Sequence, residues 1–330
     1  MTTFRKNLLR LLPALGLNVT PLGSGSAMIS RHDKDRASSV ADGLWVIRRG
    51  TSRVSARSPA HAAAIAAEGV KGGRCKAVEL SPGAHLLVDP VAARERTHRV
   101  QKTAADYFGS EHIGAMLDFY EVNCVVDVGA HVGQFARRLR ATGYTGRIVS
   151  FEPVPHNVEK LRKRAKKDPN WWVYQCALGD TEETTPMHVV HGSMSSLLGP
   201  SEYGSNRYKR FREISMEDVP VRRLDGMLDE VTEGIENPRP YLKMDTQGYD
   251  LHVFEGAGER IKEFVGMQSE VALLQIYADM PRMHEAVSTF EAAGFEITGM
   301  FPVTREIETG RILEFDCVLF RASAVPDHSA

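Results

Sequence analysis

Residues 125–135 read VVDVGAHVGQF, an apolar run followed by two glycines, Gly129 and Gly133, and then by residues of helical character. A buried strand that passes through a glycine turn into a helix places backbone N–H groups and a helix N-terminus at the carboxyl end of the strand. Open α/β sheets bind their ligands at this edge. The stretch therefore predicts an α/β fold with a ligand site at the turn. A purely structural tight turn is the alternative.

The spacing of the glycines limits the ligand. A dinucleotide-binding turn has the pattern G-x-G-x-x-G, and counted from Gly129 its second and third glycines fall on His131 and Gln134. No lysine follows, as it does in a phosphate-binding loop. The observed spacing suits a smaller group, such as the amino-acid moiety of S-adenosylmethionine. Its carboxylate would meet amides of the turn around Ala130, and its ammonium would meet Asp127.

Two further turns are expected beside the glycine turn. The next strand, RIVSF, ends before Glu152, which can accept hydrogen bonds from both hydroxyls of a ribose. Capping of the following helix is the alternative role for this carboxylate. The third strand leads into the segment QCALGD, in which Ala177 and Asp180 can flank an adenine. Asp180 either reaches the exocyclic amine or caps a turn.

The rest of the chain continues the alternation of strands and helices. Strands are expected at 123–128, 147–151, 171–175, 240–245, 265–274, 295–300 and 312–320, and helices at 134–141, 155–167, 250–262 and 281–293. Alternation implies crossover connections and a mostly parallel sheet covered by helices on both faces. Only a loop separates the last two strands, so they could form an antiparallel hairpin at the end of the sheet.

The chain of 330 residues is long enough for more than one domain. We expect an N-terminal extension of α+β character (1–105), a domain that carries the glycine turn (106–323) and a tail (324–330). Within the extension, strands are expected at 44–48 and 85–89, a helix at 58–69 and a linker at 20–40. The extension carries no chemical motif. It could complete an acceptor pocket or form the interface of a homo-oligomer.

Composition excludes a chain that is disordered, collagen-like or coiled-coil throughout. Hydrophobic residues make up 42% and charged residues 25%, as in ordinary globular proteins. Lys plus Arg is 41 and Asp plus Glu is 42, so global charge favours neither nucleic acid nor a membrane surface as a partner, and we expect neither. The four cysteines form no C-x-x-C motif, which favours a reducing, cytoplasmic location.

Five segments, taken in order, resemble the FkbM family of S-adenosylmethionine-dependent methyltransferases. They are VVDVGAHVGQF, FEP (151–153), CALGD (176–180), VRRLD (221–225) and KMDTQGYDL (243–251). The resemblance implies a class I methyltransferase (Rossmann-like) fold, a seven-stranded sheet with a terminal antiparallel strand. It also implies methylation of a hydroxyl, typically on a sugar or a polyketide-type metabolite. Members of the family often carry Glu where this chain has Gln247.

Transfer of a methyl group to a hydroxyl requires alignment of the reactants and removal of the hydroxyl proton by a base or a metal ion. Asp245 is the first candidate for the base, because it ends a predicted strand at the ligand edge of the sheet. Lys243 and Asp245 share one face of that strand and could pair. A structural Lys–Asp pair is therefore the alternative role for Asp245.

Glu270 and His191 are the other catalytic candidates. Glu270 lies in the next predicted strand, where a carboxylate among apolar residues is costly unless it is used or paired. Asp245 and Glu270 together form the candidate metal site, for a Mg²⁺ that would acidify the hydroxyl. His191 opens a segment of small residues, 191–199, which could close over the site as a lid. An exposed loop histidine is the alternative.

We therefore expect an S-adenosylmethionine-dependent O-methyltransferase acting on a small-molecule or glycoside acceptor. A nucleic-acid methyltransferase is one rival, because residues 203–212 (YGSNRYKRFR) interleave basic and aromatic side chains. A solvated basic loop is the other interpretation of that segment. A non-catalytic cofactor-binding or scaffold protein is the second rival. His131 and Gln134 disfavour an NAD-dependent oxidoreductase.

Overall fold

The computed structural model describes residues 18–23, 26–30, 36–41, 44–48, 76–81, 84–88, 97–306 and 308–327, with side chains from residue 104 onward. The chain divides into two compact units, Met1–Tyr107 and Phe108–Ala330. None of the helices in the described part of the chain is both long and apolar enough to span a membrane.

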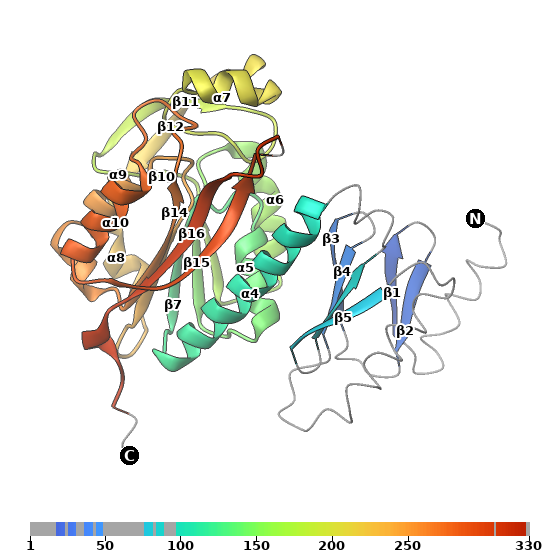
Figure 1. Cartoon of the computed structure of the whole chain (residues 1–330). Helices are drawn as coiled ribbons and strands as arrows, with labels where there is room; N and C mark the ends of the chain where they lie inside the picture. Colours follow the sequence, from blue (N-terminus) through green and yellow to red (C-terminus); the bar gives the residue numbers. More distant parts are fainter. Residues whose placement is uncertain are drawn as a thin grey trace. The chain divides into compact units, whose positions relative to one another are not determined.

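The described residues of the first unit are six β-strands and the start of helix α4 (Thr97–Phe119), which continues into the second unit (Figure 1). An antiparallel pair consists of β1 (Asn18–Gly23) and β2 (Ser26–Ser30). A four-stranded antiparallel sheet has the order β3 (Arg36–Ala41), β4 (Leu44–Arg48), β6 (Ala84–Val88) and β5 (Lys76–Ser81). The strands expected at 44–48 and 85–89 are confirmed, and the helix expected at 58–69 lies outside the described residues.

The linker expected at 20–40 is wrong, because β1, β2 and β3 occupy much of it. Its Gly, Ser and charged residues are typical of loops. Strand pairing is made by backbone groups, however, and does not require apolar side chains.

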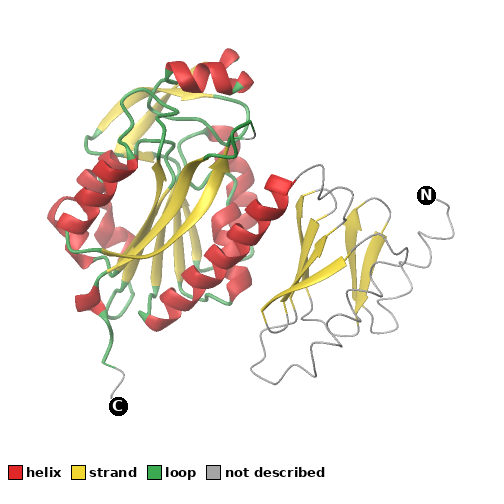
Figure 2. Ribbon diagram, viewed as in Figure 1, coloured by secondary structure: helices red, strands yellow, loops and turns green. Residues whose placement is uncertain are grey.

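The second unit is built on a seven-stranded sheet, shown with its flanking helices in Figure 2. Its strands, in spatial order, are β15 (Glu296–Arg305), β16 (Ile312–Phe320), β14 (Gly266–Ala272), β13 (Pro240–Met244), β7 (Cys124–Val128), β8 (Arg147–Phe151) and β9 (Trp171–Tyr174). These are the seven strands expected from the sequence. The five from β14 to β9 are mutually parallel. β16 is antiparallel to both β14 and β15.

The expected fold class is therefore confirmed: a mostly parallel seven-stranded sheet with a terminal antiparallel strand, as in class I methyltransferases. The hairpin expected at the end of the sheet is also confirmed, since β15 and β16 pair antiparallel. The last strand in the sequence enters the sheet between β14 and β15.

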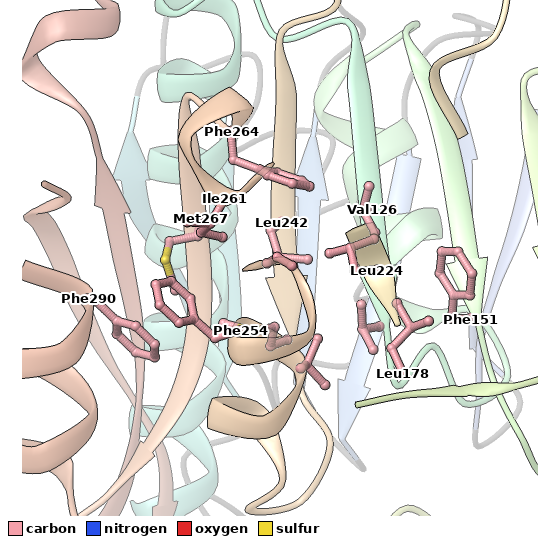
Figure 3. Packing of buried hydrophobic residues seen from close by; sticks show 14 of the residues in the cluster. Val126, Phe151, Leu178, Leu224, Leu242, Phe254, Ile261, Phe264, Met267 and Phe290 are labelled. Carbon is pink, nitrogen blue, oxygen red and sulfur yellow. The ribbon is translucent and has the colours of Figure 1, made fainter. Parts of the chain in front are cut away.

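Helices cover both faces of this sheet (Figure 1). One face packs against α4 (Thr97–Phe119), α5 (Gln134–Thr142) and α6 (Pro155–Ala165). The other packs against α8 (Leu224–Thr232), α9 (Asp250–Gly256) and α10 (Met283–Ala292). Figure 3 shows this second core, where Leu224, Phe254 and Phe290 from the helices meet Val126 and Leu242 from the strands.

A smaller sheet that the sequence did not reveal lies after β9. It consists of β10 (Ala177–Leu178), β12 (Ser215–Arg222) and β11 (Glu183–Val189), in that spatial order. Short helices complete the unit: α7 (Glu202–Arg207) and the 3₁₀ helices η2 (Lys209–Arg212), η3 (Gly258–Glu263) and η4 (Ala322–Ala324). The helix expected at 250–262 is thus divided into α9 and η3.

Candidate active site

The glycine turn connects β7 to α5 and is held against the end of β8. The N–H groups of Gly129 and Ala130 both donate to the carbonyl of Phe151, at 3.0 Å. The N–H of Gly133 donates to the carbonyl of Ala130 at 2.8 Å. These three amides shape the turn and are not directed at a ligand. The free N–H groups of the first turn of α5 are the remaining donors for an anion.

Gly129 brings two functional segments into close contact. Its φ is +74°, and a Cβ added there would lie 2.0 Å from the carbonyl oxygen of Asp245. Only glycine fits such a position. The turn after β7 therefore lies directly against the turn after β13, so the predicted cofactor turn and the predicted base are neighbours.

Glu152 is buried and faces the glycine turn, with 5% of its surface exposed. Its Oε2 accepts from the N–H of His131 at 2.8 Å. Its Oε1 accepts from the N–H of Val154 at 3.1 Å and from Nδ2 of Asn157 at 3.2 Å. Burial raises the pKa of Glu152, and the three hydrogen bonds oppose this. Both roles considered for this carboxylate remain, since it bonds the start of α6 and also the glycine turn.

His131 has a left-handed backbone conformation, with φ of +49°. Its Nδ1 lies 2.9 Å from Nε2 of Gln134, and the ring also hydrogen-bonds the carbonyl of Gly192. Burial lowers the pKa of His131, against the effect of these hydrogen bonds. The two residues that replace the glycines of a dinucleotide turn thus bond to each other, and His131 joins the turn to the 191–199 segment.

Asp127 is fully buried within β7. Its Oδ1 forms an ion pair with Nζ of Lys243 at 3.1 Å, and its Oδ2 accepts from the Ser150 hydroxyl at 3.1 Å. Both carboxylate oxygens therefore already face protein groups, and the expected contact of Asp127 with an ammonium group stays a prediction. Lys243 also donates to the carbonyls of Val128 and Gly129, at 3.3 Å each.

The predicted pairing of Lys243 with Asp245 is confirmed, with Nζ 3.6 Å from Oδ2. Burial lowers the pKa of Lys243, but the charges of Asp127 and Asp245 outweigh this effect and the net shift is upward. The ammonium therefore stays charged inside the sheet. It connects the glycine turn to the base candidate.

Ala177 and Asp180 lie around β10, which leaves the main sheet and pairs with β12. Ala177 is buried. Asp180 is partly exposed; its Oδ1 lies 3.4 Å from the Tyr249 hydroxyl and 3.3 Å from Nδ1 of His252. Its carbonyl accepts from Arg223 at 2.6 Å, so the VRRLD segment supports this turn.

Asp245 and Glu270 are brought together, and Gln247 lies between them. Nε2 of Gln247 is 2.9 Å from Oδ1 of Asp245 and 3.0 Å from Oε2 of Glu270. The side chain of Asp245 is 44% exposed, so it is open to a substrate. The link that Gln247 makes between the two carboxylates was not predicted from the sequence.

Further acids surround this pair on the same face of the sheet. Glu270 is opposite Asp316 in the pairing of β14 with β16, and Glu314 lies one pleat away. Burial, and then the neighbouring carboxylates, raise the pKa of Glu270 well above its usual range. Burial raises the pKa of Glu314 to about 7 and that of Asp316 to about 6, with Asp245 adding to both shifts.

The pKa of Asp245 is shifted in the opposite direction. Burial raises its pKa, but the Lys243 ammonium and the Gln247 amide outweigh this and hold the pKa below its usual value. Two adjacent carboxylates with opposite shifts are the arrangement expected of an acid–base pair.

The 191–199 segment contacts this site through the Ser196 side chain and the Met194 backbone. The Ser196 hydroxyl donates to the carbonyl of Gln247 at 2.8 Å, and the Tyr277 hydroxyl lies 3.0 Å from the carbonyl of Met194. His191 itself is exposed on this segment. Among the contacts of the described residues, none joins its ring to Asp245 or Glu270. The structure therefore favours an exposed loop histidine over a base.

Asp245 and Glu270 were expected to hold a Mg²⁺ ion. The amide nitrogen of Gln247 lies between their oxygens instead. Within residues 104–327, the three-ligand group close enough to hold an ion is a different one, Asp180, His252 and Glu255. It lies at the edge of α9, and Glu255 is exposed.

The basic segment 203–212 carries one buried aromatic ring and two partly exposed ones, Tyr203 and Tyr208. Phe211 is buried, and Tyr208 packs in the same cluster with Tyr277. Arg207 lies over the Tyr208 ring at 5.5 Å and within 3.9 Å of Glu308. Nucleic-acid binding of the kind considered above needs aromatic faces open to bases.

Residues 127–297, just over half of the chain, match the family model described as the methyltransferase FkbM domain. The chain is similar to Methyltransferase sdnD of Sordaria araneosa, with 29% identity over 163 residues that span 43% of this chain and 62% of that protein.

Two solved structures are similar at lower identity. Fibrillarin of Aeropyrum pernix, bound to S-adenosyl-L-methionine, is 12% identical with a TM-score of 0.37, over 92% of this chain and 99% of that chain. The O-methyltransferase of Bacillus cereus, in complex with SAH, is also 12% identical with a TM-score of 0.37, over 65% of this chain and 81% of that chain.

Proposed function

Because the chain belongs to the FkbM family of methyltransferase domains, we propose that it is an S-adenosylmethionine-dependent O-methyltransferase. The acceptor in this proposal is a hydroxyl of a sugar or of a glycosylated or polyketide-type metabolite. The observation that carries the proposal is the contact of Gly129 with the backbone of Asp245, which sets the cofactor turn beside a half-exposed carboxylate.

The residues around the glycine turn fit the cofactor. A carboxylate has about four acceptor positions, and Glu152 uses three of them within the protein, so one is left for a ribose hydroxyl. The first turn of α5 would meet the amino-acid carboxylate. Ala177 and Asp180 would flank the adenine. When bound, S-adenosylmethionine supplies an electrophilic methyl group on its sulfonium.

Asp245 would act as the general base. The nearby Lys243 ammonium and Gln247 amide favour its ionised form, so it can accept the proton that the acceptor hydroxyl loses. Glu270, whose pKa is raised, would stay protonated and donate a hydrogen bond. Orientation of the acceptor against the methyl group would supply the rest of the rate enhancement.

The location and assembly of the protein belong to the same proposal. Cys124, Cys176 and Cys317 are free and buried, as expected of a protein in a reducing, cytoplasmic compartment. We retain the homo-oligomer and the absence of nucleic acid and membrane as proposals. Analytical ultracentrifugation, with and without added RNA at physiological salt, would test them.

The direct test combines binding and transfer. Calorimetry with S-adenosylmethionine and with NAD should give binding of the first alone. A labelled-methyl assay across neutral and amino glycosides, with and without a chelator, should identify an acceptor. Binding of S-adenosylmethionine without transfer to any hydroxylated acceptor would favour the non-catalytic rival. Absence of binding would contradict the proposal.

A variant pair makes the binding test specific. Glu152→Gln removes the charge of the buried carboxylate and should weaken S-adenosylmethionine binding at least tenfold, since charge-assisted hydrogen bonds are the strong ones. Glu159→Gln, on the exposed face of α6, is the matched control and should bind normally.

A further inference from the structure

Gln247 occupies a strained position at the centre of the site. Its φ is +57°, in the left-handed region that a residue other than glycine adopts only at a cost. Its side chain and backbone nevertheless make four contacts, with Asp245, Glu270, Tyr277 and Ser196. Strain that is retained at such a point indicates that the contacts matter.

Chemistry fixes the orientation of the amide. An ionised carboxylate only accepts hydrogen bonds, so the amide group that faces Asp245 must be the –NH₂. That group has two hydrogens, one for each of the neighbouring carboxyl groups. The carbonyl oxygen then points to the Tyr277 hydroxyl, at 2.8 Å.

Gln247 also contacts the 191–199 segment. The hydroxyl of Ser196, which is fully buried, donates to the Gln247 carbonyl at 2.8 Å. Tyr277 contacts both the Gln247 side chain and the carbonyl of Met194 in that segment. The position of the segment and that of the carboxylates are therefore joined at one residue.

We propose that Gln247 is a positioning residue for methyl transfer. Its amide nitrogen holds the Asp245 carboxylate toward the acceptor, and it occupies the place between Asp245 and Glu270 that a divalent cation would otherwise fill. The inference rests on the proposed function, in which Asp245 is the base. It predicts that the native protein works without a metal. It also predicts that loss of the amide hydrogens can be offset by a cation.

The test uses two replacements of similar size in the full chain. Gln247→Met removes both hydrogen bonds and should lower kcat by about 10²-fold, the loss typical of a misplaced reactive group. The KM for S-adenosylmethionine should change less than about twofold, because the amide acts on the base. Glu236→Met, at an exposed glutamate outside the site, is the control for introducing a methionine and should behave as the native protein.

Gln247→Glu supplies the second readout. It places three carboxylates together, and oxygen ligands of this kind favour Mg²⁺ and Mn²⁺. Electron paramagnetic resonance should show one more bound Mn²⁺ in this variant than in the native protein, whose Asp180, His252 and Glu255 could hold an ion of their own. Addition of Mn²⁺ should raise its kcat, while native kcat should be insensitive to both Mn²⁺ and chelator.

Three results would overturn the proposal. The first is native kcat in Gln247→Met, and the second is loss of native activity with a chelator. The third is Mn²⁺ bound to Gln247→Glu with no increase in kcat. Should Gln247→Met fail to fold, Tyr277→Phe is the second variant, because it removes the hydroxyl that contacts the Gln247 amide oxygen. Its kcat should fall roughly 2- to 10-fold, the equivalent of one hydrogen bond. Native kcat in Tyr277→Phe would likewise contradict the proposal.

The design separates this inference from the proposed function. If the native protein methylates no hydroxyl acceptor, the proposed function fails. The Mn²⁺ measurement still tests the position of Gln247 between Asp245 and Glu270, because it compares metal binding to Gln247→Glu and to the native protein and needs no turnover. Equal numbers of bound Mn²⁺ in the native protein and in Gln247→Glu would then overturn the proposed role of Gln247 separately.

Discussion

Lys243 and Asp127 form an ion pair inside the seven-stranded sheet, with Nζ 3.1 Å from Oδ1 and with 5% and 0% of the two side chains exposed. The two residues are register partners on the adjacent strands β13 and β7. Lys243 also reaches Asp245 and the carbonyl oxygens at the start of the glycine turn. One buried ammonium therefore fixes the relative positions of both halves of the site.

Removal of either partner should be strongly destabilising. Lys243→Met leaves the Asp127 carboxylate buried without its counter-charge, and Asp127→Asn leaves the ammonium with a weaker partner. Breaking a buried pair typically costs about 3–5 kcal/mol. The double variant Asp127→Asn/Lys243→Met should cost less than the sum of the single changes. Urea unfolding of the four proteins measures this coupling, and strict additivity would show that the pair is not a unit.

Gly129→Ala should damage both the fold and cofactor binding, because its Cβ would lie 2.0 Å from the Asp245 carbonyl oxygen. Gly143→Ala is the matched control. Its φ is +102°, but an added Cβ has no atom within 4 Å, so only the backbone cost of about 1 kcal/mol applies. Thermal unfolding and calorimetry with S-adenosylmethionine should separate the two. Equal behaviour would argue against the close approach of the two turns.

Asp245→Asn should abolish most turnover and preserve cofactor affinity. Loss of a general base typically lowers the rate by about 10²–10⁴-fold. Asparagine keeps the shape of the side chain, and Glu152 and the glycine turn are unchanged. A labelled-methyl assay and calorimetry on the same preparation would measure both quantities. Full activity would remove Asp245 from the mechanism.

Stability should decrease as the pH rises from about 4 to 8, in part because of two acids, the buried Glu314 and the partly exposed Asp316. Burial raises the pKa of Glu314 to about 7 and that of Asp316 to about 6. The native state therefore binds more protons than the unfolded state in this range, so the free energy of unfolding falls with increasing pH. Below the unfolded-state pKa values both states are protonated and the penalty disappears.

Glu314→Gln and Asp316→Asn should flatten this dependence and stabilise the protein at pH 8. Glu233→Gln, at an exposed glutamate of the same unit, is the control and should leave the slope unchanged. Urea unfolding at four pH values gives the comparison. A steeper slope in Glu314→Gln or Asp316→Asn would contradict the assigned shifts.

Strands β7, β8 and β13 of the main sheet could be predicted because each is a short, largely apolar run followed by a glycine or an acidic residue, namely Gly129, Glu152 and Asp245. The small sheet could not, because in β12 only Val219 and Val221 are buried and its other side chains resemble those of a loop. Weak alternation in β11, with Met187 and Val189 buried, was the available signal.

For the site, the sequence pattern predicted which strand ends lie next to one another. Asp245 and Glu270 follow from adjacent strand ends, and the pairing of Lys243 with Asp245 follows from alternation along β13. The partner across the sheet, Asp127, depends on a long-range pairing of β13 with β7 that the local pattern does not contain. The role of Gln247 depends on a side-chain orientation, which no spacing rule supplies.

The insertion of β16 between β14 and β15 has a consequence for how the protein is made. Neither neighbour pairs with the other, and both depend on the strand that leaves the ribosome after them. A nascent chain that ends at Arg311 therefore exposes two open strand edges, which are templates for aggregation. Synthesis of residues 312–320 closes both edges in a single step.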